Sequence, residues 1–347
     1  MKELFAVDFR DIFGGLILSI VGTAFILCML FLANGLVFNL VTSDPEKVKG
    51  IIEKSSLYEK LPATIYGQLS NETGKNEVEI PLKSPEVRQI ALDVYDPEFA
   101  RTNIENSIDG FYSWLAGETD KPDATIDFTA KNNELANRVS AYVKKRVSKL
   151  PVCSYKETLE MKGFDAFKAK CRPSTVTPDA AEREVKKVFA QSDGLLEESK
   201  VNLAEIKTDK GDPLYKNLGD LPATFSTAKY VPVALGIFAI LTIVTIFYLS
   251  KDRISAYKRM SRLLLASGLI VLLVPLAFSL VSKALLGKVS GGDSAGTIVG
   301  SISEQFILEA GKVYYGLGII LVLAAIGLYI YARRVEKDTD KLPKPKS

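Results

Sequence analysis

The chain has 347 residues, of which 47% are hydrophobic and 24% are charged, and its formal net charge is +3. Its mean hydropathy is positive, +0.13. A soluble protein with this many charges rarely reaches that value, so apolar and charged residues must be segregated along the chain. Soluble cytosolic enzymes, collagen-like fibres and disordered chains are excluded on this basis.

Four segments contain no Asp, Glu, Lys or Arg: residues 13–43, 230–250, 263–282 and 313–332. A bilayer core about 30 Å thick is crossed by roughly 20 helical residues, and each segment reaches that length. An outer-membrane β-barrel is excluded because its strands would alternate in polarity. We therefore expect an integral membrane protein of mainly α fold with four transmembrane helices, which has the lipid bilayer as a partner.

The distribution of Lys and Arg predicts the orientation. Residues 251–262 contain five of them and the tail 333–347 contains six, whereas three in residues 283–312 are balanced by three acids. Because basic residues remain on the cytoplasmic side, we expect residues 1–12, 251–262 and 333–347 inside the plasma membrane. Residues 44–229 and 283–312 are then outside it.

The first span, residues 13–43, is expected to be an uncleaved signal anchor with an external extension. A signal peptide has an apolar core of about 7–15 residues, which is much shorter than this segment. Cleavage near Ala33 is the alternative, and it leaves the remaining topology unchanged.

The long segment 44–229 is expected to be an extracytoplasmic domain, mainly helical with a minor β element. Capping side chains precede proline at several predicted helix starts, for example at Ser84 and Asp96. Apolar residues then recur at steps of three and four. Alternation predicts strands at 124–130 and 201–206, which could pair as a short ribbon. The acidic balance of this domain, −3, gives no reason to expect nucleic acid as a partner.

The cysteines agree with an external domain. Cys28 lies in the first span, and Cys153 and Cys171 lie in the long segment. An oxidising exterior favours a disulfide between the latter two, which would contribute roughly 3 kcal/mol in the chain-entropy model. Two free thiols are the alternative.

No catalytic, cofactor-binding or metal site is predicted. The chain has no histidine, which removes Ser-His-Asp and Cys-His nucleophile systems and His-ligated zinc. We find no Gly-rich phosphate loop after a strand and no distinctive carboxylate pair. We therefore expect a protein that is not an enzyme and has no cofactor.

Two segments are candidate interaction sites. Phe111, Tyr112 and Trp114 could line a groove for a ligand or partner, or they could form an aromatic end of the core. In the Gly/Ser-rich segment 283–312, Ile298, Ile302 and Phe306 share one helical face. That face predicts an amphipathic helix on the membrane surface. The alternative is a flexible loop leading into an early start of the fourth helix.

These features favour a non-enzymatic membrane protein whose external domain binds or assembles with a protein, an envelope polymer or a ligand. The protein partner would be another membrane protein or an extracytoplasmic one, and the oligomeric state is left open. The order of one span, a large external domain and three further spans resembles the layout of the FtsX/MacB-type ABC permeases. That resemblance implies the alternative function, a permease-type subunit of an export complex.

Overall fold

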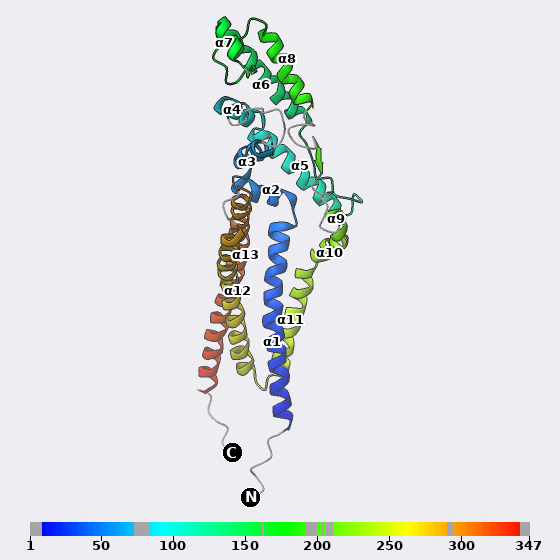
Figure 1. The fold of residues 1–347 in the computed structure, drawn as a ribbon. Coiled ribbons are helices and arrows are strands. Elements are labelled where there is room, and N and C mark those ends of the chain that lie inside the picture. Colours follow the sequence, from blue (N-terminus) through cyan, green and yellow to red (C-terminus); the bar gives the residue numbers. More distant parts are fainter. Residues whose placement is uncertain are drawn as a thin grey trace, which may run out of the picture. The chain divides into compact units, whose positions relative to one another are not determined.

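The computed structural model describes residues 9–72, 84–161, 163–191, 200–202, 205, 211–289 and 294–340. The chain is divided into two compact units. The first unit consists of Met1–Ser55 and Asp220–Ser347, and the second consists of Ser56–Gly219. Helices account for most of both units (Figure 1).

The first unit is a bundle of long apolar helices with short helices at one end. Its elements are α1 (Phe9–Val37), η1 (Phe38–Thr42), α2 (Pro45–Lys54), α10 (Leu221–Ala228), α11 (Val231–Leu249), α12 (Arg253–Val289) and α13 (Ser294–Asp340). Figure 1 shows α1, α11, α12 and α13 running side by side. Their central turns are apolar and uncharged, so the helices pack there through a shared cluster of apolar side chains.

Four helical segments are long and apolar enough to cross a membrane, as the sequence predicts. They are Gly15–Thr42, Val231–Leu249, Arg253–Ser282 and Ile298–Asp338. Only a third or less of each is buried inside the bundle. Large apolar side chains such as Ile20, Ile240 and Leu323 are mostly exposed on the outer faces. Exposed apolar faces of this extent are typical of lipid-facing helices.

α12 and α13 form an antiparallel pair that packs at glycines. A Cβ on Gly268 would lie 3.0 Å from the carbonyl oxygen of Gly318, and a Cβ on Gly318 would lie 2.6 Å from Cγ of Leu272. Close approach at small residues maximises van der Waals contact between membrane helices. Near this crossing, the hydroxyl of Ser261 donates a hydrogen bond to the carbonyl oxygen of Ala325 (2.9 Å).

The α12 and α13 helices extend well beyond the uncharged segments. Residues 251–262 and 283–312 are expected as loops, but α12 begins at Arg253 and ends at Val289, and α13 begins at Ser294. The first eight residues of the tail, 333–340, also belong to α13. Charged residues mark the end of the apolar segment, but they do not end the helix, because an established helix adds further turns at little cost. The expected loop boundaries therefore differ from the helix ends.

The second unit has helices of ordinary length and one short ribbon. Its elements are α3 (Leu57–Glu72), α4 (Pro85–Val94), α5 (Pro97–Leu115), β1 (Thr125–Asp127), α6 (Thr129–Lys149), α7 (Tyr155–Glu160), α8 (Pro178–Gln191), β2 (Lys200–Asn202) and α9 (Leu214–Asn217). The unit is shorter than the predicted domain 44–229, because α2 and α10 belong to the first unit.

The core of the second unit follows the predicted helical spacing. On α6, every fourth residue from Leu135 to Val147 is fully buried: Leu135, Val139, Val143 and Val147. The first two belong to a core cluster with residues of α4 and with Phe189 of α8, and the last two to a cluster with Ala181 of α8. The predicted caps also form, because the side chains of Ser84 and Asp96 accept hydrogen bonds from backbone amides in the first turns of α4 and α5.

The predicted ribbon is present but shorter than expected. β1 and β2 are antiparallel, with Thr125 opposite Asn202 and Asp127 opposite Lys200. The last pair adds an ion pair between Lys200 Nζ and the Asp127 carboxylate (3.1 Å). The first strand ends at Asp127 because α6 begins two residues later. Residues 203, 204 and 206 of the second predicted strand lie outside the described residues.

A glycine in α5 permits the close return of the chain toward β1. A Cβ added at Gly110 would lie 1.8 Å from the carbonyl oxygen of Asp123. Gly110→Ala should therefore destabilise this unit by about 2–3 kcal/mol, because backbone atoms would have to move. Urea unfolding of the purified chain, followed by the fluorescence of Trp114, the only tryptophan, measures this loss.

Gly67→Ala is the matched control in the same unit. A Cβ there meets nothing within 4 Å, so the greater helix propensity of alanine should leave stability unchanged or raise it by up to about 1 kcal/mol. Equal stability of the Gly110→Ala variant and the unmodified protein would contradict the close approach.

Candidate functional site

The predicted aromatic groove lies at the end of α5, where one ring is buried. Trp114 is only 4% exposed, whereas Phe111 and Tyr112 are half-buried. The rings of Phe111 and Trp114 pack together with centroids 5.3 Å apart. The indole thus contributes mainly to packing, and the phenyl and phenol rings remain partly accessible. Their role as a groove stays a prediction.

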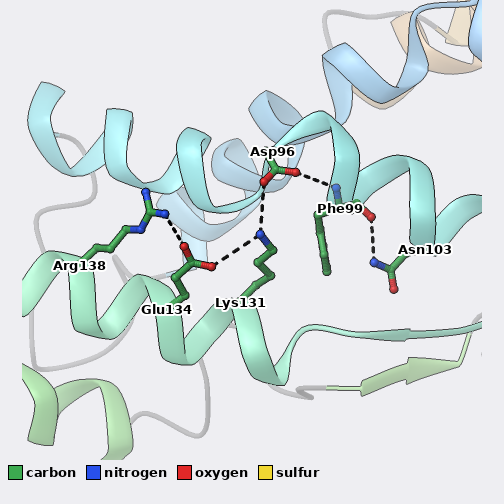
Figure 2. Close-up of polar contacts among 6 residues, drawn as sticks. All are labelled: Asp96, Phe99, Asn103, Lys131, Glu134 and Arg138. Carbon is green, nitrogen blue, oxygen red and sulfur yellow. Dashed lines mark hydrogen bonds and ion pairs between the residues drawn. The ribbon is translucent and has the colours of Figure 1, made fainter.

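A chain of charged side chains connects α5 with α6 (Figure 2). The Asp96 carboxylate accepts hydrogen bonds from the backbone N–H of Phe99 (2.7 Å) and from Lys131 Nζ (3.3 Å). Lys131 also lies 3.6 Å from the carboxylate of Glu134, which forms a second ion pair with Arg138. Lys131 therefore bridges two carboxylates from two helices.

The chemistry of this network indicates a structural role. Burial raises the pKa of Asp96, but the hydrogen bonds from Phe99 and Lys131 outweigh it, so the pKa is lowered overall. A carboxylate of lowered pKa is ionised at neutral pH and cannot serve as a general acid. The Lys131 ammonium also lies over the Phe99 ring, 5.7 Å from its centroid. These contacts hold the start of α5 against α6.

Next to this network lies the buried side chain of Tyr95, which the sequence did not predict. Tyr95 is fully buried and donates a hydrogen bond from its hydroxyl to Oδ1 of Asn132 (2.6 Å). Burial raises the pKa of Tyr95 far above its ordinary value, so the phenol remains neutral. Its ring packs near Phe99 and Phe128. The pair is a polar contact within the core of the second unit.

Cys153 and Cys171 form the predicted disulfide, with their Cα atoms 4.9 Å apart. Backbone hydrogen bonds fix both ends of the enclosed segment: Cys153 N–H donates to the Arg172 carbonyl, and Arg172 N–H donates to the Pro151 carbonyl, each at 2.9 Å. The Arg146 guanidinium, from α6, donates to the carbonyl oxygens of Ala166 (3.2 Å) and Ala169 (3.3 Å). The segment is thus attached to α6 at several points.

The short helix α7 inside this closed segment has a well-formed start. The Ser154 hydroxyl caps the helix, and the Glu157 carboxylate accepts a hydrogen bond from the Ser154 backbone N–H (2.7 Å). The Ser154 hydroxyl also donates to the Glu157 carboxylate (2.6 Å), and this bond together with the one from the Ser154 N–H lowers the pKa of Glu157. A capping box satisfies two backbone donors reciprocally, so α7 has a defined geometry despite its six residues.

On this fixed backbone, three large apolar side chains face water. Val152 is 55% exposed, Leu159 69% and Tyr155 82%. Among the described residues of the second unit, no other large apolar side chain is mostly exposed. Exposed apolar groups gathered in one segment are typical of interaction sites.

Cations accompany these apolar residues. Lys149, Lys156 and Lys170 lie within a few residues of the disulfide, are exposed, and make no ion pair with any described residue. We call these six residues the disulfide-loop surface: Lys149, Val152, Tyr155, Lys156, Leu159 and Lys170. Sequence reasoning identified the disulfide but missed this surface. The weak signal was a concentration of Lys and Arg between residues 142 and 191, where they outnumber Asp and Glu twelve to six.

The residues predicted to form a membrane-surface helix lie in the first turns of α13. Ile298 and Ile302 are half-buried, and Phe306 is 38% exposed. They are continuous with the fourth apolar span, in line with the alternative of an early helix start. Whether this face touches a membrane surface stays a prediction.

In the part of the chain that the structure describes, no three His, Cys, Asp or Glu side chains gather in a way that could hold a metal ion. No protein-family model, curated protein or solved structure matches the chain.

The Asp96 contacts predict a pH-dependent contribution to stability. Because the pKa of Asp96 is lowered in the folded protein, its stabilisation is present above the ordinary Asp pKa of about 3.9 and is lost as the pH falls through the lower folded value. Asp96→Ala should cost about 1–2 kcal/mol at pH 7. The difference from the unmodified protein should shrink at acidic pH, below the ordinary Asp pKa of about 3.9.

Urea unfolding followed by Trp114 fluorescence at both pH values measures this effect. Lys131→Met is the matched control, because it removes the ion pair but keeps the cap, and it should cost less than Asp96→Ala. An Asp96→Ala deficit of equal size at neutral and acidic pH would show that the carboxylate charge is not involved.

Proposed function

We propose that this chain is a non-enzymatic, multi-pass protein of the plasma membrane whose second unit is an extracytoplasmic domain that binds a protein partner. The N- and C-termini are then cytoplasmic, in accordance with the basic residues of 251–262 and 333–347. An oxidising exterior also accounts for the disulfide of the second unit.

The disulfide-loop surface is the observation that supports binding most directly. A small domain gains stability by burying Tyr, Leu and Val, so three such side chains left in water on a rigid backbone need another explanation. Interfaces commonly place aromatic and aliphatic side chains at the centre with charged residues around them. Tyr155, at the start of α7, has the character of such a central residue.

The charge around this surface favours a protein with acidic groups. Lys149, Lys156 and Lys170 have no described ion-pair partner, so carboxylates of a bound protein could pair with them without breaking existing contacts. Complementary charge speeds encounter and selects partners. An apolar patch ringed by Asp and Glu on the partner matches this surface.

The permease-type alternative receives less support. Such a subunit must contact an ATPase on the cytoplasmic side, and residues 250–252 alone separate α11 from α12. Among the described residues, the other surface on that side consists of the start of α1, the first turns of α12 and the end of α13. Proton- or ion-coupled transport is also disfavoured, because the uncharged cores of the spans contain no buried acid or base.

Site-specific photocrosslinking in intact cells tests the proposed function. A photoreactive residue at Tyr155 should give a discrete adduct with one protein. The same residue at Arg183, which is exposed on α8, should not. The purified partner should then bind the purified full chain. Changing Lys149, Lys156 and Lys170 together to Glu should weaken that binding at least ~10-fold, as should Tyr155→Ser.

Three outcomes would contradict the proposed function. Adducts confined to lipid, or a partner whose affinity is the same for the unmodified chain and both variants, would overturn the role of this surface. Co-purification of a stoichiometric ATPase that is unaffected by these variants would instead support the permease alternative.

A further inference from the structure

Cations gather where the α11–α12 junction meets the end of α13. Residues 250–262 and 333–340 together contain eight Lys and Arg against four Asp and Glu. The antiparallel packing of α12 and α13 brings the two segments together: Lys258 Nζ lies 2.6 Å from the Glu336 carboxylate, and the rings of Tyr257 and Tyr331 are 5.2 Å apart. We call this region the cationic end of the bundle.

Aromatic residues place the cationic end at the edge of an apolar layer. Tyr248 is among the most exposed tyrosines of the chain, and Tyr329 and Tyr331 are also exposed. Tyrosine concentrates at the level of lipid headgroups, where its ring is apolar and its hydroxyl is hydrated. The apolar helix α11 ends one residue beyond Tyr248. The cations are therefore positioned where phosphate groups of a bilayer lie.

Arg259 differs from the other cations of this end. It precedes Leu263 by one helical turn, and Leu263 packs so closely on α1 that a Cβ at Gly22 would lie 3.1 Å from its Cδ2. Arg259 thus lies on the side of α12 that is turned toward α1. Its Nη1 is buried and has no hydrogen-bond acceptor among the described residues. A buried guanidinium N–H without an acceptor is costly, so an acceptor is expected.

The neighbouring cations already have interaction partners. Lys258 pairs with Glu336, the Arg262 Nε donates to the Lys258 carbonyl oxygen (3.4 Å), and the Arg333 guanidinium lies over the Tyr329 ring. Arg259 Nη1, in contrast, has no acceptor among the described residues, although it lies in a region of net positive charge.

We propose that Arg259, at the junction of α1 and α12, binds the phosphate of an anionic phospholipid headgroup. A guanidinium offers two parallel donors to phosphate oxygens and binds them more strongly than a neutral donor would. The surrounding positive charge favours a headgroup with a net negative charge over a zwitterionic one. The acyl chains would lie along the exposed apolar faces of the same helices.

An internal ion pair is the competing explanation. Asp11 lies in the first turns of α1, and a carboxylate could satisfy the same donor. The experiment must separate a lipid from this residue.

The single free cysteine provides a selective readout of the first unit. Cys28 is buried, and its thiol donates to the carbonyl oxygen of Leu235 (3.2 Å), whereas the other two cysteines are joined in the disulfide. A thiol-reactive fluorogenic dye therefore reports the unfolding of the bundle. We would heat the full chain in nanodiscs of phosphatidylcholine alone and in nanodiscs that also contain phosphatidylglycerol.

Phosphatidylglycerol should raise the midpoint of the unmodified protein by at least ~3 °C, because a ligand that binds the folded state stabilises it. Arg259→Gln should lose most of this gain, and Arg259→Lys should keep part of it. Arg183→Gln is the charge-matched control, since Arg183 is exposed in the second unit, and it should keep the whole gain. If Arg259→Gln is not recovered folded, Arg259→Lys carries the comparison.

Equal midpoints of the unmodified protein in the two bilayers would overturn the proposal, as would a full gain in Arg259→Gln. A third contrary result concerns Asp11. If Asp11→Asn and Arg259→Gln lower the midpoint equally in phosphatidylcholine, and the double variant lowers it no further, the acceptor is the carboxylate and not a lipid.

Discussion

The requirement that backbone N–H and C=O groups be satisfied without water governs the first unit. Only a helix meets this requirement within one apolar segment, and each of the four uncharged segments is helical. Lateral contact must then come from close packing and a few polar contacts. Gly268 and Gly318 allow α12 and α13 to approach, and the Tyr314 hydroxyl donates to Oδ1 of Asn34 on α1 (2.8 Å). Ion pairs appear toward the helix ends, as for Lys258 and Glu336.

The second unit is stabilised by the interactions that are usual in water-soluble domains. Amphipathic helices bury a stripe such as that of α6, caps satisfy the helix starts, and the disulfide closes a loop that lacks a core of its own. Phe164 and Phe167 of that loop pack on the core formed with α6 and α8, and the Arg146 guanidinium donates to its backbone carbonyls. The side chains of Tyr155 and Leu159 take no part in this packing and stay exposed. Tyr155 and Leu159 are therefore available for a partner.

Sequence reasoning identified what depends on local pattern. The segments without charged residues predicted the four apolar helices. The spacing of apolar residues predicted the buried face of α6, and the capping residues predicted where α4 and α5 begin. For residues 283–312 it left two alternatives open, and the start of α13 at Ser294 is in line with the early helix start. It did not give the end of α12 at Val289, because Gly and Ser suggest a loop. Contacts between residues distant in sequence were also missed: the bridging of Asp96 by Lys131, the pairing of Tyr95 with Asn132, and the burial of Trp114. Such contacts depend on tertiary packing, which no local spacing encodes.

The central claim is the proposed topology, in which residues 56–219 are outside the plasma membrane and the cationic end is on its cytoplasmic side. Single cysteines at Asp120, which is exposed in the second unit, and at Lys337, which is exposed near the end of α13, test it directly in intact cells with a membrane-impermeant maleimide. The unmodified chain is the blank, since Cys28 is buried. We expect labelling of the Asp120→Cys variant in intact cells and of the Lys337→Cys variant only after permeabilisation. Labelling of both variants from outside, or of Lys337→Cys alone, would contradict the account.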